Sequence, residues 1–128
     1  MIDTHETAAA TTDRGPRGKA IGFIDSYATA SRMAEILEAT GIPREQIVLI
    51  SGEAGESLWD ELMGRALWGE QAEMLFHQGA AVLKDGQVIF TVDVPDHNSA
   101  ERVANIAVSH GGRNVTYFGD FVDTQLTA

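Results

Sequence analysis

The order of hydrophobic segments predicts an α+β fold built from two similar halves. Residues 20–51 have the pattern of a strand, a helix and a strand, and residues 88–118 repeat that pattern. Between the halves lies a longer stretch with helical spacing, residues 53–86. Two β-α-β units that share one four-stranded antiparallel sheet, with two helices on one face, form the split arrangement called ferredoxin-like. The sequence therefore predicts a ferredoxin-like domain with an inserted helical pair.

Length and composition limit the class of protein. The chain has 128 residues, and 44% of them are apolar, which favours one domain with a hydrophobic core. Cysteine is absent, so disulfides, thiolate metal sites and cysteine nucleophiles are excluded. Nine Lys and Arg against 19 Asp and Glu give a net charge of 9 − 19 = −10. We expect such an acidic chain to bind neither nucleic acid nor an acidic membrane surface.

The two ends of the chain carry weaker patterns. Residues 1–19 lack a sustained period and an apolar signal segment, so we expect a flexible tail on a cytoplasmic protein. No apolar run reaches the ~18 residues of a membrane helix, which predicts a soluble protein. We expect a single domain over residues 20–122 and a C-terminal tail over residues 123–128.

The first half opens with an apolar strand that leads into a capped helix. Ser26 or Asp25 can accept hydrogen bonds from the first turn, and apolar side chains follow at three- and four-residue spacing. Gly41 ends this helix because glycine adopts the left-handed conformation readily. The next run, IVLI at residues 47–50, has no polar face and predicts a buried strand.

The second half repeats this layout. Residues 88–94 alternate in the manner of a half-buried strand, which Pro95 ends. Asn98 precedes Glu101 by three positions, the spacing of a capping box, and predicts the start of a helix. That helix ends at Gly111, and residues 114–118 form the last predicted strand.

A shift of 70 positions aligns the two predicted helices. Identical residues then coincide: Ala30 with Ala100, Arg32 with Arg102, Ala34 with Ala104, Ile36 with Ile106 and Gly41 with Gly111. Either an internal repeat or chance agreement in an alanine-rich helix explains these matches. The predicted architecture requires no common descent of the halves.

The middle segment predicts two amphipathic helices with a break at Gly69. Its outer face is acidic, with Glu53, Glu56, Asp60, Glu61, Glu70 and Glu73. Trp59, Met63 and Trp68 are candidate residues of a protein–protein interface, because aromatic residues and Met are enriched in such contacts. The alternative is that these side chains cover the open face of the sheet or pack against the other helices.

Three short patterns are candidates for ligand chemistry. Asp25, Ser26 and Tyr27 stand at the start of a helix, where free N–H groups can receive a small ligand, although a helix cap explains them equally well. Glu73 and His77 lie four positions apart and form a weak candidate metal pair. No further ligand stands at a related spacing, so we expect an exposed helix pair, with no metal and no cofactor.

A glycine-rich stretch after residues 47–50 resembles the layout of a phosphate loop. Gly52, Gly55 and Ser57 follow a strand and precede a helix, but the Lys of such a loop is missing and acidic residues stand in its place. We therefore interpret Gly52 and Gly55 as a turn and Ser57 as a helix cap.

The predicted sheet requires cover on both faces. The residues 47–50 are all apolar, so either the inserted helices or a second copy of the chain must cover the face opposite the first two helices. The sequence favours a homo-oligomer on this ground. The inserted helices are also a possible docking surface for a protein partner.

Two stretches resemble a known family. IGFIDSYATA at residues 21–30, followed by GIP at 41–43 and IVLI at 47–50, resembles the opening of the general-stress-protein family (seventeen-M-like), a heat-induced stress-protein domain of bacteria. GRNVTYFGDF at residues 112–121 is similar to its end. The resemblance implies a stress-associated accessory or regulatory domain without established catalysis, and supplies no active-site residue. The acidic middle segment departs from the family, where that segment is often Gly-rich and apolar.

These observations favour a non-enzymatic binding module that self-associates. Two alternatives belong to other classes. One is a small enzyme in which His77, His97 or His110 acts with Asp or Glu as acid and base. The other is a sensor that binds a small molecule at a subunit boundary.

Overall fold

The computed structural model describes residues 15–64, 69–119 and 123–127 of the chain. Its elements are β1 (Lys19–Ile24), α2 (Tyr27–Ala39), the 3-10 turn η1 (Arg44–Gln46), β2 (Ile47–Ile50), α3 (Gly52–Gly64), α4 (Glu70–Lys84), β3 (Val88–Asp93), α5 (His97–Val108), β4 (Arg113–Phe118) and β5 (Asp123–Gln125). In the described residues this is an α+β fold with four α-helices and one open five-stranded sheet.

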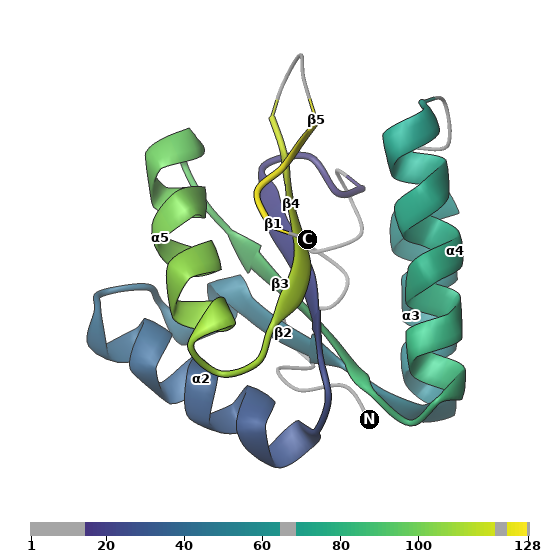
Figure 1. Cartoon of the computed structure of the whole chain (residues 1–128), viewed down its shortest axis with the longest axis horizontal. Helices are drawn as coiled ribbons and strands as arrows, with labels where there is room; N and C mark the ends of the chain where they lie inside the picture. The colour runs from purple at the N-terminus through teal and green to yellow at the C-terminus, as the bar shows by residue number, and fades with distance from the viewer. Residues whose placement is uncertain (1–14, 65–68, 120–122, 128) are drawn as a thin grey trace.

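The sheet has the strand order β2-β3-β1-β4-β5, and every neighbouring pair is antiparallel. β1 lies at the centre and pairs with β3 and β4, which come last among the long strands of the chain (Figure 1). The prediction that both halves of the sequence contribute to one sheet is therefore confirmed.

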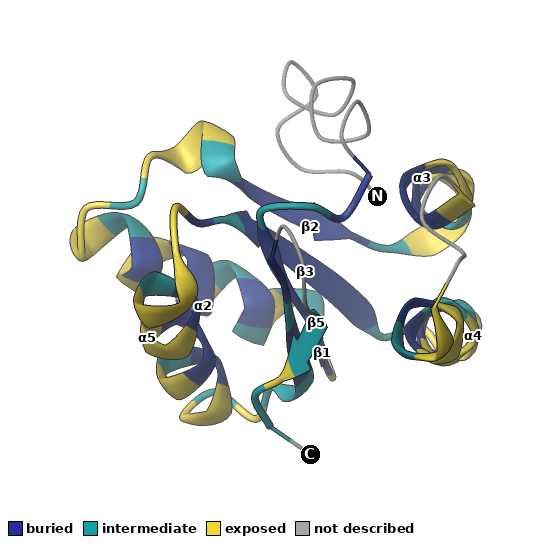
Figure 2. Cartoon of the chain, turned by 90° about the horizontal axis from the view of Figure 1, so that it is seen from above, coloured by how far each residue is buried: buried dark blue, intermediate teal, exposed yellow. Residues whose placement is uncertain are grey.

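Helices cover both faces of this sheet. α2 and α5 lie on one face, and α3 and α4 lie on the other, so the fold has three layers (Figure 1). The buried sides of the helices face the sheet and their exposed sides face outward (Figure 2). The inserted helical pair thus provides, within one chain, the cover that the apolar sheet needs.

Alternation along β3 places its side chains in two separate cores. Val88, Phe90 and Val92 pack with α2 and α5, whereas Ile89 packs with α3 and α4. The prediction of a half-buried strand is wrong, because the second face, which was expected to be solvated, is covered by α3 and α4. The prediction that residues 47–50 are buried on both faces is confirmed.

The first core joins α2 and α5 to the sheet through small and medium side chains. The buried helical residues are Ala30, Met33, Ala34 and Leu37 of α2 and Ala100, Val103, Ala104 and Ala107 of α5. The two helices begin 97 − 27 = 70 positions apart, the same offset that aligns their sequences. The predicted cap Ser26 is confirmed, since its hydroxyl accepts from the Thr29 N–H at 3.2 Å.

The cap of α5 differs from the prediction. Asp96, and not Asn98, is the N-cap, and its carboxylate accepts from the Ser99 N–H at 2.8 Å. Asp and Asn are almost equally good caps, and the Glu101 spacing favoured the wrong one. Gly41 and Gly111 follow their helices with φ of 107° and 82°, as predicted.

The second core is built around Trp59, whose side chain is fully buried. The Trp59 indole N–H donates to the Phe76 carbonyl at 3.0 Å, so α3 and α4 are joined by a hydrogen bond as well as by packing. Gly79 faces the indole ring directly, and a Cβ atom at this position would overlap it. This glycine therefore sets how closely α3 and α4 approach.

Three boundaries differ from the sequence predictions. Lys19, assigned to the flexible tail, is the buried first residue of β1, and residues 1–14 lie outside the described residues. Part of the predicted C-terminal tail pairs with β4 as β5. α3 begins at Gly52, so Gly55 and Ser57 lie inside a helix, and Gly55 packs against Ile50.

The helices differ in length and in apolar character, the two properties that decide whether a helix can cross a membrane. In the part of the chain that the structure describes, none of the helices combines the length and apolar character that crossing a membrane requires.

Replacing Gly79 with alanine is expected to destabilise the fold, because the added methyl group would overlap the Trp59 ring. Overpacking of this kind lowers the free energy of unfolding by about 1–3 kcal/mol. The matched control is Gly64→Ala at the end of α3, where an added Cβ meets no atom within 4 Å. Alanine there is expected to stabilise by about 0.5–1 kcal/mol. Urea unfolding followed by circular dichroism measures both variants, and equal stability of Gly79→Ala and wild type would contradict the close α3–α4 contact.

Candidate functional site

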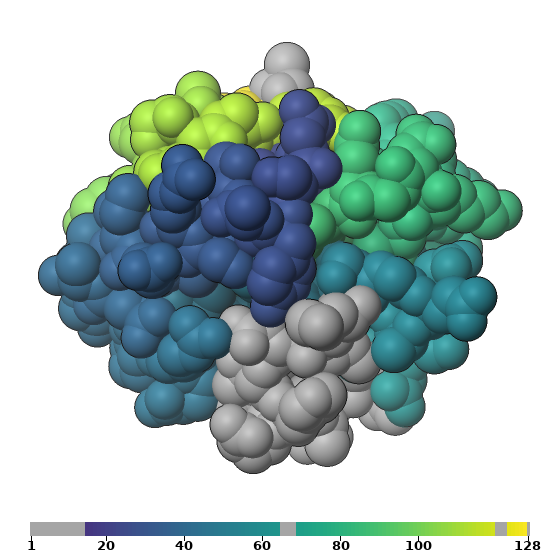
Figure 3. Space-filling view, turned by 90° about the horizontal axis from the view of Figure 1, so that it is seen from below, coloured from purple at the N-terminus to yellow at the C-terminus, as the bar shows by residue number. Residues whose placement is uncertain are grey.

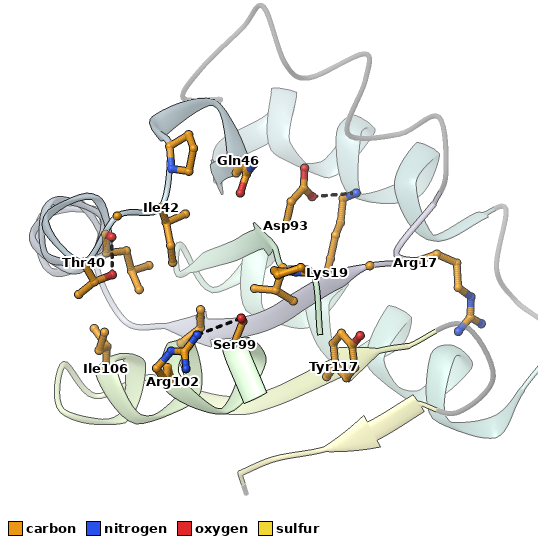
Figure 4. Close-up of a pocket in the computed structure, with 17 residues that line it drawn as sticks. Arg17, Lys19, Thr40, Ile42, Gln46, Asp93, Ser99, Arg102, Ile106 and Tyr117 are labelled. Atoms are coloured by element: carbon orange, nitrogen blue, oxygen red, sulfur yellow. Dashed lines mark hydrogen bonds and ion pairs between the residues drawn. The ribbon is translucent and has the colours of Figure 1, made fainter. Parts of the chain in front are cut away.

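A cleft of about 790 Å³ opens beside the first layer of helices (Figure 4). The C-terminal end of α2 and the N-terminal half of α5 form its two walls, and the neighbouring ends of β1 and β3 close it. This volume lies within the ~300–1,000 Å³ that is usual for small-molecule sites. We call this feature the α2–α5 cleft.

The apolar part of the α2–α5 cleft comes from both helices and the loop after α2. Leu37 and Val103 line it from the first core and are almost fully buried, at 0% and 1% exposure. Ile42, Ile106 and Tyr117 add partly buried apolar surface. A ligand in this cleft would therefore contact aliphatic and aromatic side chains.

The charged part of the cleft is positive, unlike the chain as a whole. Arg17, Lys19 and Arg102 line it, together with the single carboxylate of Asp93. The lining charge is 3 − 1 = +2, whereas the chain carries −10. Three of the nine basic residues of the sequence thus meet in one cleft.

Lys19 and Asp93 form an ion pair at the strand ends beside the cleft, on the opposite side of the strands from Arg102 (Figure 4). The Lys19 Nζ lies 3.1 Å from the Asp93 Oδ1, and the side chains are 4% and 45% exposed. The two residues are register partners on neighbouring strands, which brings their side chains together. Because a buried ammonium needs a charged partner, Asp93 is required to keep Lys19 in place.

Arg17 joins the start of β1 to the segment between β4 and β5. Its guanidinium donates to the Gly119 carbonyl at 2.8 Å and to the Asp123 carboxylate at 2.5 Å. It also lies over the Phe118 ring, 5.7 Å from the centroid. The Arg17 charge is therefore already neutralised by a carboxylate of the protein.

Arg102 differs from these two cations. Its guanidinium donates to the Ser99 hydroxyl at 3.1 Å, a neutral acceptor one turn earlier in α5. Among the described residues, no carboxylate forms an ion pair with Arg102. Its charge also helps to lower the pKa of the nearby Asp96 carboxylate, which is held at the helix cap by the Ser99 N–H. Arg102 is thus the cation of the cleft that is not held in an ion pair with a described carboxylate.

The predicted ligand site at Asp25, Ser26 and Tyr27 lies at the other end of α2. Asp25 accepts from Arg113 at 2.9 Å, Ser26 caps the helix, and Tyr27 packs against the first core. In Figure 3 this purple-to-blue segment and the yellow-green segment of the second half lie side by side on one face. These residues serve capping and packing roles and do not line the α2–α5 cleft.

The weak metal candidates lie on the exposed side of α4. Glu73 and His77 are both exposed, and the His77 ring lies edge-on to Phe76 at 5.3 Å. In the described segments, no group of three or more His, Asp or Glu residues is placed to hold a metal ion. Nothing in this arrangement singles out the pair as a metal centre.

The predicted interface residues are divided by burial. Trp59 and Met63 are fully buried in the second core, which does not agree with a place on an exposed docking surface. The reason is that α3 turns its aromatic side toward the sheet, which was the alternative interpretation of these residues. Trp68 lies outside the described residues.

The histidines proposed for acid–base catalysis do not meet in one cleft. His77 belongs to the layer on the far side of the sheet from α5, and neither His97 nor His110 lines the α2–α5 cleft. His97 contacts Glu101 at 2.8 Å and the Tyr117 ring at 5.8 Å. His110 Nδ1 lies 2.9 Å from the Ile106 carbonyl oxygen.

Sequence reasoning missed the cations of the cleft. Arg17 and Lys19 precede the first apolar residue of β1 and were assigned to a tail, and Arg102 was considered only as the match of Arg32. One available signal was that Arg102 and Ile106 are four positions apart, and therefore share one side of α5.

Comparison with protein-family models, with curated proteins and with solved structures finds no match to this chain. The resemblance to the general-stress-protein family therefore stays a prediction from short sequence motifs. The function has to be inferred from the residues of the cleft themselves.

The Asp96 cap beside the cleft is expected to make stability depend on pH. Hydrogen bonds from the Ser99 backbone and side chain lower the pKa of Asp96 below its ordinary value of 3.8, with a smaller effect of Arg102. Since the folded pKa is lowered, this stabilisation is fully present above pH 3.8 and is lost as the pH falls through the folded pKa. Asp96→Asn keeps a neutral cap but removes the titration.

Thermal unfolding at about pH 6 and about pH 2.5 measures this effect. We expect the stability difference between wild type and Asp96→Asn to shrink at the lower pH. A difference that is the same at both values would contradict the lowered pKa.

Proposed function

We propose that this protein is a non-enzymatic binding module that holds a small organic molecule in the α2–α5 cleft. The observation that carries the proposal is the cleft itself: an adequate volume, an apolar lining from Ile42 and Ile106, and a cation, Arg102, that is not held in an ion pair with a described carboxylate. Sites with a mostly apolar wall and a few placed polar groups are typical of small-molecule binding.

The composition of the lining favours binding over catalysis. No histidine is among the lining residues in the described part of the chain, and the one lining carboxylate, Asp93, is paired with Lys19. General acid–base catalysis needs a titrating group within reach of the substrate and free to exchange a proton. The described lining offers groups that can recognise a ligand, but it offers no histidine and no unpaired carboxylate for this role.

The strand order supports the ferredoxin-like interpretation of the domain. β1 lies between β3 and β4, β3 lies between β1 and β2, and all of these neighbours are antiparallel. The helices that follow β1 and β3 lie on the same face of the sheet (Figure 1). β5 and the pair α3–α4 are then additions to that arrangement.

The lining of the proposed site comes from one chain. α3 and α4 cover the sheet face for which a second copy was considered, so the proposed function does not require self-association. A homo-oligomer and a stress-associated role are separate proposals that rest on the sequence alone.

Filling the cleft is expected to abolish binding. In Ile106→Trp the larger side chain occupies the apolar part of the cleft, and Thr40→Trp does the same from the α2 side, at an exposed position where folding is not at risk. The matched control is Ile36→Trp, which adds the same ring to α2 outside the cleft, at a residue that is 42% exposed.

The probe is 1-naphthaleneacetate, followed by changes in amide chemical shifts. We expect wild type and Ile36→Trp to show saturable shifts at residues around the cleft, and both occluded variants to show none. Native mass spectrometry of the purified protein tests in parallel for a retained molecule. If wild type shows no shift at the cleft and retains no molecule, the proposed function is wrong.

A further inference from the structure

We infer that the ligand of the α2–α5 cleft is an apolar organic acid with a single negative charge, whose acid group pairs with Arg102 and whose apolar part lies against Ile106 and Ile42. This inference rests on the proposed function and adds the chemical class of the ligand. It follows from which charges of the cleft are already paired and from where its apolar residues stand.

The protein's own carboxylates neutralise two of the three cations in the cleft. Arg17 is held by Asp123, and Lys19 is held by Asp93. Breaking either pair to bind a ligand would leave a partly buried charge without its partner, which is costly. Arg102 can accept a carboxylate without breaking an ion pair, and its planar fork of N–H donors suits a carboxylate group.

The start of α5 cannot replace Arg102 as the donor. The Ser99 backbone N–H, which would otherwise point at an anion, donates to the Asp96 cap. The acid group of a ligand therefore depends on the side chains, and Arg102 with Ser99 is the pair that lies on the cleft side of α5 (Figure 4).

The apolar requirement comes from the next turn of the same helix. Ile106 lies four positions after Arg102, so the two side chains are neighbours, with Cβ atoms roughly 5–6 Å apart in a regular helix. Ile42, in the loop after α2, lies on the opposite wall and is partly exposed. A ring or short chain joined to a carboxylate by one or two bonds spans this distance.

The limit to one charge comes from the pairing of the other cations. Lys19 is held by Asp93 and Arg17 by Asp123, so Arg102 is left as the one cation of the described lining for a ligand, and a second acid group would lack a counterion. A second acid group would also lie near the C-terminal end of α2, which is the negative end of the helix dipole. The net charge of −10 on the chain adds to this effect.

The test compares three probes on the full chain: 1-naphthaleneacetate, its neutral amide 1-naphthaleneacetamide, and inorganic phosphate. We expect the acetate to bind at least roughly tenfold more tightly than the amide, because a charge-assisted hydrogen bond contributes in this range. We expect phosphate alone to bind weakly or not at all, because it lacks the apolar part.

The variant Arg102→Met removes the charge and keeps an apolar stem. It is expected to lower the affinity for the acetate by roughly tenfold and to leave the amide unaffected. The matched control is Arg32→Met, which removes the corresponding arginine of the first half, an exposed residue of α2 outside the cleft. Unfolding curves of both variants confirm that the fold is retained.

The outcomes separate this inference from the function on which it rests. Equal affinity for acetate and amide, or an unchanged acetate affinity in Arg102→Met, overturns the inference while binding in the cleft still supports the proposed function. Phosphate binding at Arg102 as tight as that of the acetate also overturns the inference, since the apolar part would contribute nothing. Absence of all binding at the cleft contradicts both.

Discussion

A sheet that is apolar on both faces must be covered on both faces, and the rest of this structure depends on that constraint. Phe90 and Ile89 are neighbours in β3, yet both are completely buried, one in each core. In a two-layer arrangement, the apolar side chains on one face of the sheet would be exposed to water. This exposure costs about 25 cal/mol per Å² of apolar surface. The insertion of α3 and α4 removes this cost within a single chain.

The same constraint places the cleft. Helices cover the middle of each face, and the α2–α5 cleft opens where one of these covering helices ends. α2 ends at Ala39, and the chain then turns through Gly41. α5 begins at His97, after the connection that follows β3. The cleft lies between these two helix ends, and its lining includes charged residues at the ends of β1 and β3.

The spacing of apolar residues and the residues at helix ends were sufficient to predict most of the helices and strands. Gly41, Gly69 and Gly111 mark helix boundaries because the backbone there needs glycine or tolerates it. Which layer covers the second face could not be predicted, since the apolar run at residues 47–50 requires cover but does not identify its source. The cleft was missed for a related reason. Lys19 is buried because it forms an ion pair with Asp93, and this pair forms only once β1 and β3 are in register.

The central position of β1 has a consequence for how the chain folds. β1 is the first strand in the sequence, but its neighbours β3 and β4 begin 88 − 24 = 64 and 113 − 24 = 89 positions after it ends. Contacts this distant in sequence are slow to form, because the intervening loop must be closed before any pairing is gained. During synthesis, β1 therefore leaves the ribosome with both of its edges unpaired. β3 can pair with one edge once it has emerged, and the other edge stays unpaired until the segment containing β4 follows. The helices can form locally in that interval, so we expect helical structure to precede the complete sheet.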